Sequence, residues 1–311
     1  MKKKLIIDTD CGSDDAMAIA MALNDPKYEI IMFSTVSGNV HVTQATQNTL
    51  STIEHAGSYE PPVYVGADHM LLRNMVYAHE THGNDGMGDI GIVPTRLTAE
   101  NENSVIKMVE LLEASQDGEI DIIAIGPLTN IALAIRLNLD AVKKAGRIVV
   151  MGTAGLGRGN ASPVAEFNIW QDPESAKIVT EAGLDNLIYV GWDASLGKSM
   201  LTPEDIKKIK SESTLGKFTI DVNKDLLEMN VKRFGGEYLD MADPSAIAAA
   251  LYPDCIVDCD KYYCEVDTNK GPSYGAMLVD VNNVLGKEPN AYICSKLDPQ
   301  LYKNYIFKTL A

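Results

Sequence analysis

Positively charged residues are scarce in this sequence. Its 311 residues include 27 Lys and Arg against 43 Asp and Glu, which gives a formal net charge of −16. A nucleic-acid partner requires clustered Lys and Arg that neutralise phosphates, so the composition argues against such a partner. Surface acidity promotes solubility and carries no information about the fold.

Long apolar runs are also missing from the sequence. A membrane-spanning helix needs about 20 apolar residues, so we expect no membrane association. The first residues, MKKKLIIDTD, begin with lysines, but Asp8 and Asp10 interrupt the apolar run after three residues. A secretory signal needs an apolar stretch of about 7–15 residues. These features predict a cytoplasmic protein.

Cysteines are few and are not spaced like metal ligands. The five are Cys11, Cys255, Cys259, Cys264 and Cys294. The group near residue 260 lacks the CxxC spacing that usually marks a zinc site. We therefore expect buried, reduced thiols, as in other cytoplasmic proteins.

Short apolar runs alternate with helical patterns through the first two thirds of the chain. The runs are mostly rich in Ile and Val, as buried parallel strands are, and they cover 5–7, 30–36, 62–65, 121–125, 147–151 and 187–190. Helical patterns occur between them, including 14–23, 42–56, 104–114 and 173–182. This alternation predicts an α/β fold with a mostly parallel, open, Rossmann-like sheet flanked by helices. No linker or repeat is visible, so we predict one domain over residues 1–311.

The pattern changes after Met200. Helices are predicted at 202–210, 221–234 and 243–251, and Thr202 is expected as the N-cap of the first, followed by Pro203. The C-terminal third is therefore predicted to be a helical cap region with some closing strands. Ligands of parallel α/β sheets bind beyond the carboxyl ends of the strands. We expect the chemistry just after Ile7, Val36, Ile125, Met151 and Val190.

An acidic loop directly follows the first predicted strand. Asp8, Asp10, Asp14 and Asp15 place four carboxylates within eight residues, and like charges this close repel unless something neutralises them. No lysine is nearby, and Ca²⁺ favours several carboxylate and carbonyl oxygens. An acidic loop that merely caps a helix is the alternative, but such loops commonly use one or two Asp residues. The spacing therefore favours a site for a hard divalent cation such as Ca²⁺.

Several motifs, taken in order, resemble those of the nucleoside hydrolase family. The acidic loop, DTDCGSDDA at 8–16, is similar to the family's DTDxGxDDAxA signature. Further matches are TVSGNV at 35–40, HGNDGMG at 82–88, GPLTNIALA at 126–134, AEFNIWQDPESA at 165–176 and the pair Asp243-Pro244. The resemblance implies calcium-dependent hydrolysis of the N-glycosidic bond of a ribonucleoside to ribose and free base. It also implies a homodimer or homotetramer.

The resemblance assigns a role to each matched residue. The implied Ca²⁺ ligands are the carboxylates of Asp10, Asp15 and Asp243 and the main-chain carbonyl of Ile125. The implied ribose contacts are Asp14 and Asn39 at the 2′- and 3′-hydroxyls, with Asn160, Glu166 and Asn168 at the 3′ and 5′ side. Asp10 would also be the general base for a metal-bound water. Asp8 is expected to orient the loop.

One position departs from the family pattern. Many relatives have a histidine immediately before the last Asp ligand, where this chain has Ala242, and no histidine lies beyond His82. Three explanations are open. In the first, His82 donates a proton to the leaving base or binds it. In the second, stacking on an aromatic ring makes a purine basic enough for solvent to protonate it. In the third, the true substrate has a better leaving group. The aromatic candidates are Trp192, Trp170, Tyr238 and Tyr274.

Two other functions compete with the hydrolase. A calcium-dependent ribose or nucleoside binder without efficient turnover is consistent with Ala242. A Mg²⁺-dependent phosphohydrolase of the haloacid-dehalogenase type also begins with a strand and DxD, with Asp8 as nucleophile and Asp10 as acid/base. That second alternative leaves Asp14, Asp15 and Asn39 without a function.

Overall fold

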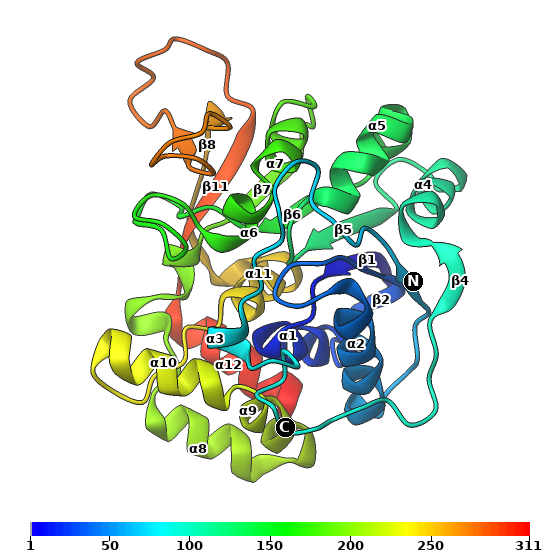
Figure 1. Ribbon diagram of the computed structural model, residues 1–311, viewed down its shortest axis with the longest axis vertical. Coiled ribbons are helices and arrows are strands. Elements are labelled where there is room, and N and C mark those ends of the chain that lie inside the picture. Colours follow the sequence, from blue (N-terminus) through cyan, green and yellow to red (C-terminus); the bar gives the residue numbers. More distant parts are fainter. Residues whose placement is uncertain (1) are drawn as a thin grey trace.

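A single large sheet organises the protein. The computed structural model describes residues 2–311, within which nine strands form one sheet in the order β4-β3-β2-β1-β5-β6-β7-β11-β8 (Figure 1). The edge strand β8 is antiparallel to β11, and the other neighbours are parallel. Their bounds are β1 Lys3–Thr9, β2 Tyr28–Thr35, β3 Val63–Val65, β4 Glu100–Asn103, β5 Ile120–Ala124, β6 Ile148–Met151, β7 Leu187–Val190, β8 Ile256–Tyr262 and β11 Ala291–Leu297.

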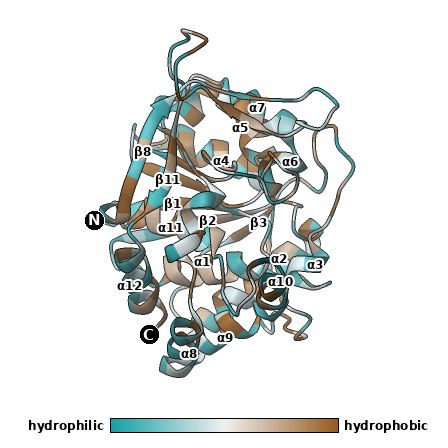
Figure 2. Ribbon diagram, turned by 90° about the vertical axis from the view of Figure 1, so that its left-hand side faces the viewer, coloured by the Kyte–Doolittle hydropathy of each residue, from teal (hydrophilic) through white to brown (hydrophobic). Residues whose placement is uncertain are grey.

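Helices cover both faces of this sheet, as Figures 1 and 2 show from two directions. One layer contains α4 Ser104–Ala114, α5 Thr129–Lys143, α6 Phe167–Gln171 and α7 Pro173–Thr180. The other contains α1 Ser13–Leu23, α2 Val42–Ala56, α11 Ala242–Leu251 and α12 Pro299–Leu310. Each layer buries its own apolar cluster against the sheet. The predicted fold class is confirmed. Ile- and Val-rich strands are buried on both faces, so the sheet needs helices on both sides.

The C-terminal cap region contains α8 Pro203–Glu212, α9 Thr214–Asp221 and α10 Lys224–Phe234. The Thr202 hydroxyl accepts the Asp205 N–H at 3.2 Å, which confirms the predicted N-cap. The helix predicted over 221–234 is confirmed for Lys224–Phe234, but it starts three residues later than predicted, because Asp221 ends α9. The chain turns at Val222 and Asn223, where the Asn223 side chain donates to the Thr219 carbonyl at 2.8 Å and to the Ser13 carbonyl at 2.7 Å. That second bond ties the cap to the acidic loop.

Smaller elements complete the fold. The helix α3 spans His79–His82, and β9 Cys264–Val266 pairs with β10 Met277–Val279 in a separate two-stranded sheet. Short 3₁₀ helices cover Trp192–Ser195, Gly197–Ser199 and Pro253–Cys255. Across residues 2–311, no helix combines the length and apolar character that crossing a membrane would require.

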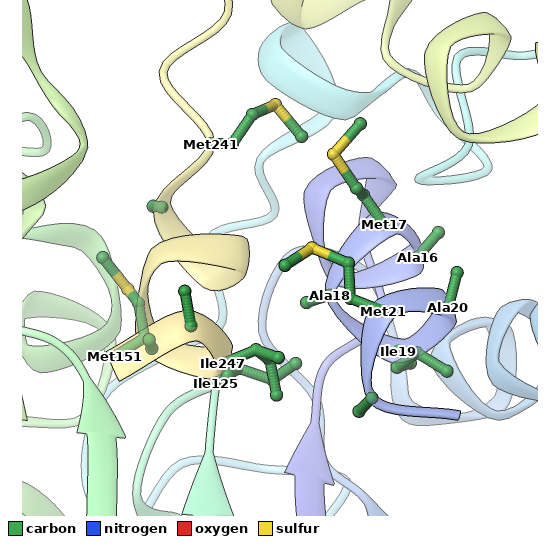
Figure 3. Close-up of a cluster of buried hydrophobic side chains, with 14 of the residues drawn as sticks. Ala16, Met17, Ala18, Ile19, Ala20, Met21, Ile125, Met151, Met241 and Ile247 are labelled. Carbon is green, nitrogen blue, oxygen red and sulfur yellow. The ribbon is translucent and has the colours of Figure 1, made fainter. Parts of the chain in front are cut away.

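The helix α1 is held rigidly at the centre of the molecule. All of its residues are buried, although Asp14 and Asp15 stand in its first turn. Figure 3 shows Met17 and Met21 of α1 in the apolar cluster that also contains Ile247 of α11 and Ile125 after β5. Flexible methionine side chains fill irregular gaps in such a core. The acidic loop is therefore attached to a tightly packed, buried helix.

The strand order reverses between β1 and β5. From β1 the chain proceeds outwards through β2, β3 and β4, and then returns to add β5, β6 and β7 on the other side. The crossovers consequently diverge on opposite sides of this point and leave a crevice at the carboxyl ends of the strands. The acidic loop follows β1, and Ile125 follows β5, so both lie at this crevice.

Candidate active site

The acidic loop is shaped by hydrogen bonds to Asp15. Its carboxylate accepts the Thr9 hydroxyl at 2.5 Å and the Gly12 N–H at 2.8 Å. The second bond caps α1, and a negative charge in the first turn of a helix is stabilised by the helix dipole. Asn39, which follows β2, adds a side-chain donor at 3.2 Å. The loops after two neighbouring strands thus hold the same carboxylate.

Asp10 lies fully buried beside these groups. One of its carboxylate oxygens, Oδ2, accepts the Asn39 N–H at 2.6 Å, whereas Oδ1 has no protein partner. A Cβ atom at Gly38 would lie 2.1 Å from Oδ2, so only glycine permits this approach. The unpartnered oxygen destabilises the folded protein unless a ligand or a proton satisfies it.

Three carboxylates converge beside Asp10. Asp14, Asp15 and Asp243 each offer an oxygen, and these atoms lie within 4.8 Å of one another. Burial and the neighbouring negative charges raise the pKa of Asp15 to about 7 and raise the pKa values of Asp10 and Asp243 well above the ordinary range. Among residues 2–311, the one basic side chain within 4 Å of these four carboxylates is His82, whose Nδ1 lies 3.8 Å from an Asp14 oxygen. A buried, uncompensated carboxylate group of this kind fits a hard divalent cation.

Asp14, for which the resemblance implied a ribose contact, belongs to two parts of the site. Its carboxylate belongs to the converging group and also lines the pocket, so it can contact a cation as well as a sugar hydroxyl. Asp10 is outside that group but close enough for its charge to affect Asp15 and Asp14. The predicted ligand Ile125 lines the pocket, and its carbonyl oxygen accepts the Asn168 side chain at 3.1 Å.

Asp8 is buried and hydrogen-bonded within the fold. The carboxylate is fully buried, and Oδ1 accepts the side-chain N–H of Asn130 at 2.7 Å. Asn130 stands in the first turns of α5 and also donates to the carbonyl of Thr35 at 3.0 Å. This arrangement joins β1, β2 and α5, and it agrees with the expectation that Asp8 orients the loop.

Polar residues just before and within α6 form another part of the pocket lining. The Glu166 carboxylate caps α6 by accepting the N–H groups of Asn168 at 2.8 Å and Ile169 at 3.2 Å. Burial raises the pKa of Glu166 to about 7. The Asn160 side-chain oxygen accepts the Phe167 N–H at 2.9 Å. Asn160, Glu166 and Asn168 therefore stand together on one wall of the pocket, as the resemblance implied.

His82, the last residue of α3, is buried and also lines the pocket. Its Nδ1 lies 2.8 Å from the Ser13 hydroxyl and accepts the Ser13 N–H at 3.4 Å. A nitrogen that accepts from a backbone N–H carries no proton, so in the neutral ring the proton belongs to Nε2. Burial lowers the pKa of His82, which favours this neutral form. His82 lines the pocket and can offer Nε2–H as a donor there.

Trp192 closes the end of the pocket where Ala242 stands. Its indole N–H donates to Asp240 at 2.9 Å, and the Asn230 side chain donates to the other oxygen of Asp240 at 2.6 Å. The Arg233 guanidinium lies 5.4 Å from the centre of the Trp192 ring. Trp192 is thus both packed in the core and exposed to the pocket.

The other aromatic candidates lie elsewhere. Trp170 stacks against Arg73, and the Tyr274 hydroxyl donates to Glu174 at 2.9 Å. In the part of the chain that the structure describes, Tyr238 contributes a carbonyl to Asn230 but is not a lining residue of the pocket. Of the four aromatic candidates, Trp192 is the one placed to contact a bound base.

Sequence reasoning named no individual pocket residue in the cap. Four further lining residues come from the cap and from the residues before α11: Leu226, Met229, Arg233 and Asp240. The helix α10 that carries three of them has an ordinary amphipathic pattern, which gives no sign of a ligand. The function of Asn230 and Asp240 becomes clear only in the tertiary structure, where Asp240 accepts hydrogen bonds from both Asn230 and Trp192.

Comparison with known proteins identifies the family. The sequence model of the inosine-uridine preferring nucleoside hydrolases matches residues 5–304, and the chain belongs to this family. It is therefore an N-glycosyl hydrolase by family. The pyrimidine-specific ribonucleoside hydrolase RihB of Escherichia coli O1:K1 is 33% identical over 298 residues, which cover 96% of this chain and 93% of that protein.

Solved structures of the family superpose closely on this fold. The plant nucleoside hydrolase PpNRh1 has a TM-score of 0.92 at 29% identity, covering 100% of this chain and 99% of that chain. The purine-preferring ribonucleoside hydrolase from Gardnerella vaginalis has a TM-score of 0.89 at 28% identity, covering 99% and 98%. The Gardnerella vaginalis enzyme is named as purine-preferring and RihB as pyrimidine-specific, so relatives of this chain include both kinds. Family membership and the buried environment of Asp8 argue against the phosphohydrolase alternative.

Proposed function

We propose that this protein hydrolyses the N-glycosidic bond of a ribonucleoside in a calcium-dependent reaction, giving ribose and free base. The observation that carries the proposal is the buried convergence of Asp14, Asp15 and Asp243 beside Asp10. Carboxylate and carbonyl oxygens are the ligands that Ca²⁺ prefers. Asp10, Asp15, Asp243 and the Ile125 carbonyl would hold the ion, with Asp14 at its edge. When bound, calcium supplies a hard cation that positions hydroxyl groups and lowers the pKa of water.

Asp10 is proposed as the general base. Its Oδ2 is held by the Asn39 N–H, and its free Oδ1 can take the proton of the attacking water. The base departs from a ribose that becomes oxocarbenium-like, as in glycoside hydrolysis. Asp14, Asn39, Asn160, Glu166 and Asn168 surround the sugar in this proposal. Their carboxylate and amide oxygens stabilise the positive charge that develops on the ring.

His82 and Trp192 are proposed to receive the leaving base. The neutral His82 ring presents Nε2–H, which stabilises the negative charge of a departing base by hydrogen bonding. Trp192 offers an aromatic wall whose orientation is fixed by Asp240. Because Ala242 provides no proton donor, His82 carries this function alone in our proposal.

A non-catalytic calcium-dependent binder of ribose or nucleosides is the second candidate, and Ala242 is the observation that favours it. Ribose release from purine, pyrimidine and nitrophenyl ribosides, with and without a calcium chelator, separates the two. Turnover of natural nucleosides that stops on chelation supports the hydrolase. Turnover of the nitrophenyl riboside alone indicates intact sugar chemistry with a missing donor. Tight binding without any turnover supports the binder.

We also propose a single-domain protein that acts in the cytoplasm as a homodimer or homotetramer on a small nucleoside, with neither nucleic acid nor membrane as partner. The single domain is supported by β11, which adds to the same sheet as β1. The net charge of −16 supports the exclusion of nucleic acid. Light scattering on the purified protein would give its mass in solution, and a monomer would contradict the oligomer.

A further inference from the structure

Two cysteines face each other across the edge of the sheet. In the antiparallel pair of β8 and β11, Cys259 lies directly opposite Cys294. Side chains of directly opposed residues point to the same face, with Cβ atoms about 4.5–5.5 Å apart. The next pair on that face, Lys261 and Tyr292, does meet across the strands, with the ammonium 5.5 Å from the ring centre. The register therefore places the two thiols side by side.

The two thiols have unequal surroundings. Cys294 is fully buried on the inner strand, whereas Cys259 is half-buried on the edge strand β8, where a small oxidant can reach it. A hydrogen bond with the Cys294 thiol lowers the pKa of Cys259, and the same contact raises the pKa of Cys294. Because the thiolate is the reactive form, Cys259 is the more easily oxidised partner.

The remaining cysteines are less reactive by the same criteria. Cys11, Cys255 and Cys264 are buried, and burial raises the pKa of each thiol. Such thiols stay protonated and react slowly with oxidants. Any oxidation should therefore begin at Cys259.

We propose that Cys259 and Cys294 form a reversible disulfide when the protein meets a hydroperoxide. The Cys259 thiolate attacks the terminal peroxide oxygen, so that an S–O bond forms, the O–O bond breaks and an alkoxide leaves, or hydroxide where the oxidant is hydrogen peroxide. The Cys294 sulfur then attacks the Cys259 sulfenic acid, so that the S–S bond forms and the S–O bond breaks. The Cys294 proton leaves with the departing oxygen as water. The two thiols lose two electrons, and the peroxide gains them.

The strand geometry makes this bond easy to reverse. Disulfides need Cβ atoms about 3.5–4.5 Å apart, which is closer than opposed strand residues usually lie. The edge strand β8 has a neighbour on one side only and must shift towards β11. A disulfide held by such a shift is readily reduced by thiols, and thus belongs to the labile, regulatory kind.

The pair is connected to the pocket through one backbone bond. The Cys294 carbonyl accepts the Gly191 N–H at 3.0 Å, and Trp192 follows directly in the chain. Strain that the disulfide places on Cys294 is thus transmitted to the strand end that carries the Trp192 ring. We place the consequence of oxidation at the base-binding end of the pocket.

Peptide mapping of the unmodified full-length protein tests the proposal. After treatment with hydrogen peroxide and alkylation of free thiols, a non-reducing digest should contain a linked peptide with Cys259 and Cys294. Its mass should be lower than the sum of the two peptides by two hydrogen atoms, and dithiothreitol should restore both thiols. Absence of this peptide, over-oxidation of Cys259 beside a free Cys294, or a link between Cys294 and Cys255 would each overturn it.

Two variants provide matched controls. C264S removes a buried thiol on β9 and should leave the linked peptide unchanged. C294S removes the resolving thiol, so the sulfenic acid at Cys259 should persist and react with dimedone. A C294S protein that gives no dimedone adduct at Cys259 would contradict the assignment of Cys259 as the first site of oxidation.

Discussion

Replacing Asp10 with asparagine separates catalysis from folding. In the wild type, the Asn39 N–H lies 2.6 Å from Asp10 Oδ2. In Asp10→Asn the amide oxygen can still accept this hydrogen bond. The change removes the base and also removes one of the negative charges that face Asp15 and Asp14. Loss of a general base lowers kcat by about 10²- to 10⁴-fold, which corresponds to about 3–5 kcal/mol of transition-state stabilisation. The melting temperature in chelator should be unchanged or higher, because less like charge is buried.

Asp8→Asn is the matched control for this variant. Asp8 is equally buried and also has one partnered and one unpartnered oxygen, but it contacts Asn130 instead of the pocket. Its kcat should stay within about tenfold of the wild type, since it takes no proton in the reaction. Ribose release is measured at saturating calcium and nucleoside for all three proteins. If Asp10→Asn retains more than a tenth of the wild-type kcat, Asp10 is not the base.

Four further predictions concern the cation, the leaving base and the pocket wall. Because the raised pKa of Asp15, about 7, favours the protonated folded form, the metal-free protein should lose stability as the pH rises from about 4 through 7. Its melting temperature in chelator should fall over this range and recover with calcium; a flat profile would contradict the site. His82→Ala should lower kcat about 10- to 100-fold on natural nucleosides but little on a nitrophenyl riboside, whose base leaves readily. Ala242→His should raise kcat on natural nucleosides selectively, and a decrease would mean that leaving-group activation is already complete. Trp192→Phe removes the donor to the buried Asp240 carboxylate and should cost about 1–3 kcal/mol of stability in urea unfolding. An unchanged unfolding midpoint would show that this hydrogen bond stabilises nothing.

The regular core elements could be predicted well from local pattern. The helix bounds 42–56 and 104–114 agree with α2 and α4, and the strand at 187–190 agrees with β7. These segments combine a strong apolar period with clear end signals, so local and tertiary preferences coincide. The break between α9 and α10 was not predictable in the same way. It depends on Asn223, whose side chain bonds the Ser13 carbonyl from a distant part of the chain.

The sequence by itself determined the family, the fold class and the acidic loop. The reason is that the loop after β1 places four Asp residues within one short segment, and that the helix and strand periods are local properties. Only the tertiary structure decided that Asp14 joins Asp15 and Asp243, that Trp192 alone of four aromatic candidates reaches the pocket, and that Cys259 faces Cys294. Each of these relations joins residues far apart in the chain. Their proximity depends on strand order, register and helix packing, which the packed core sets as a whole.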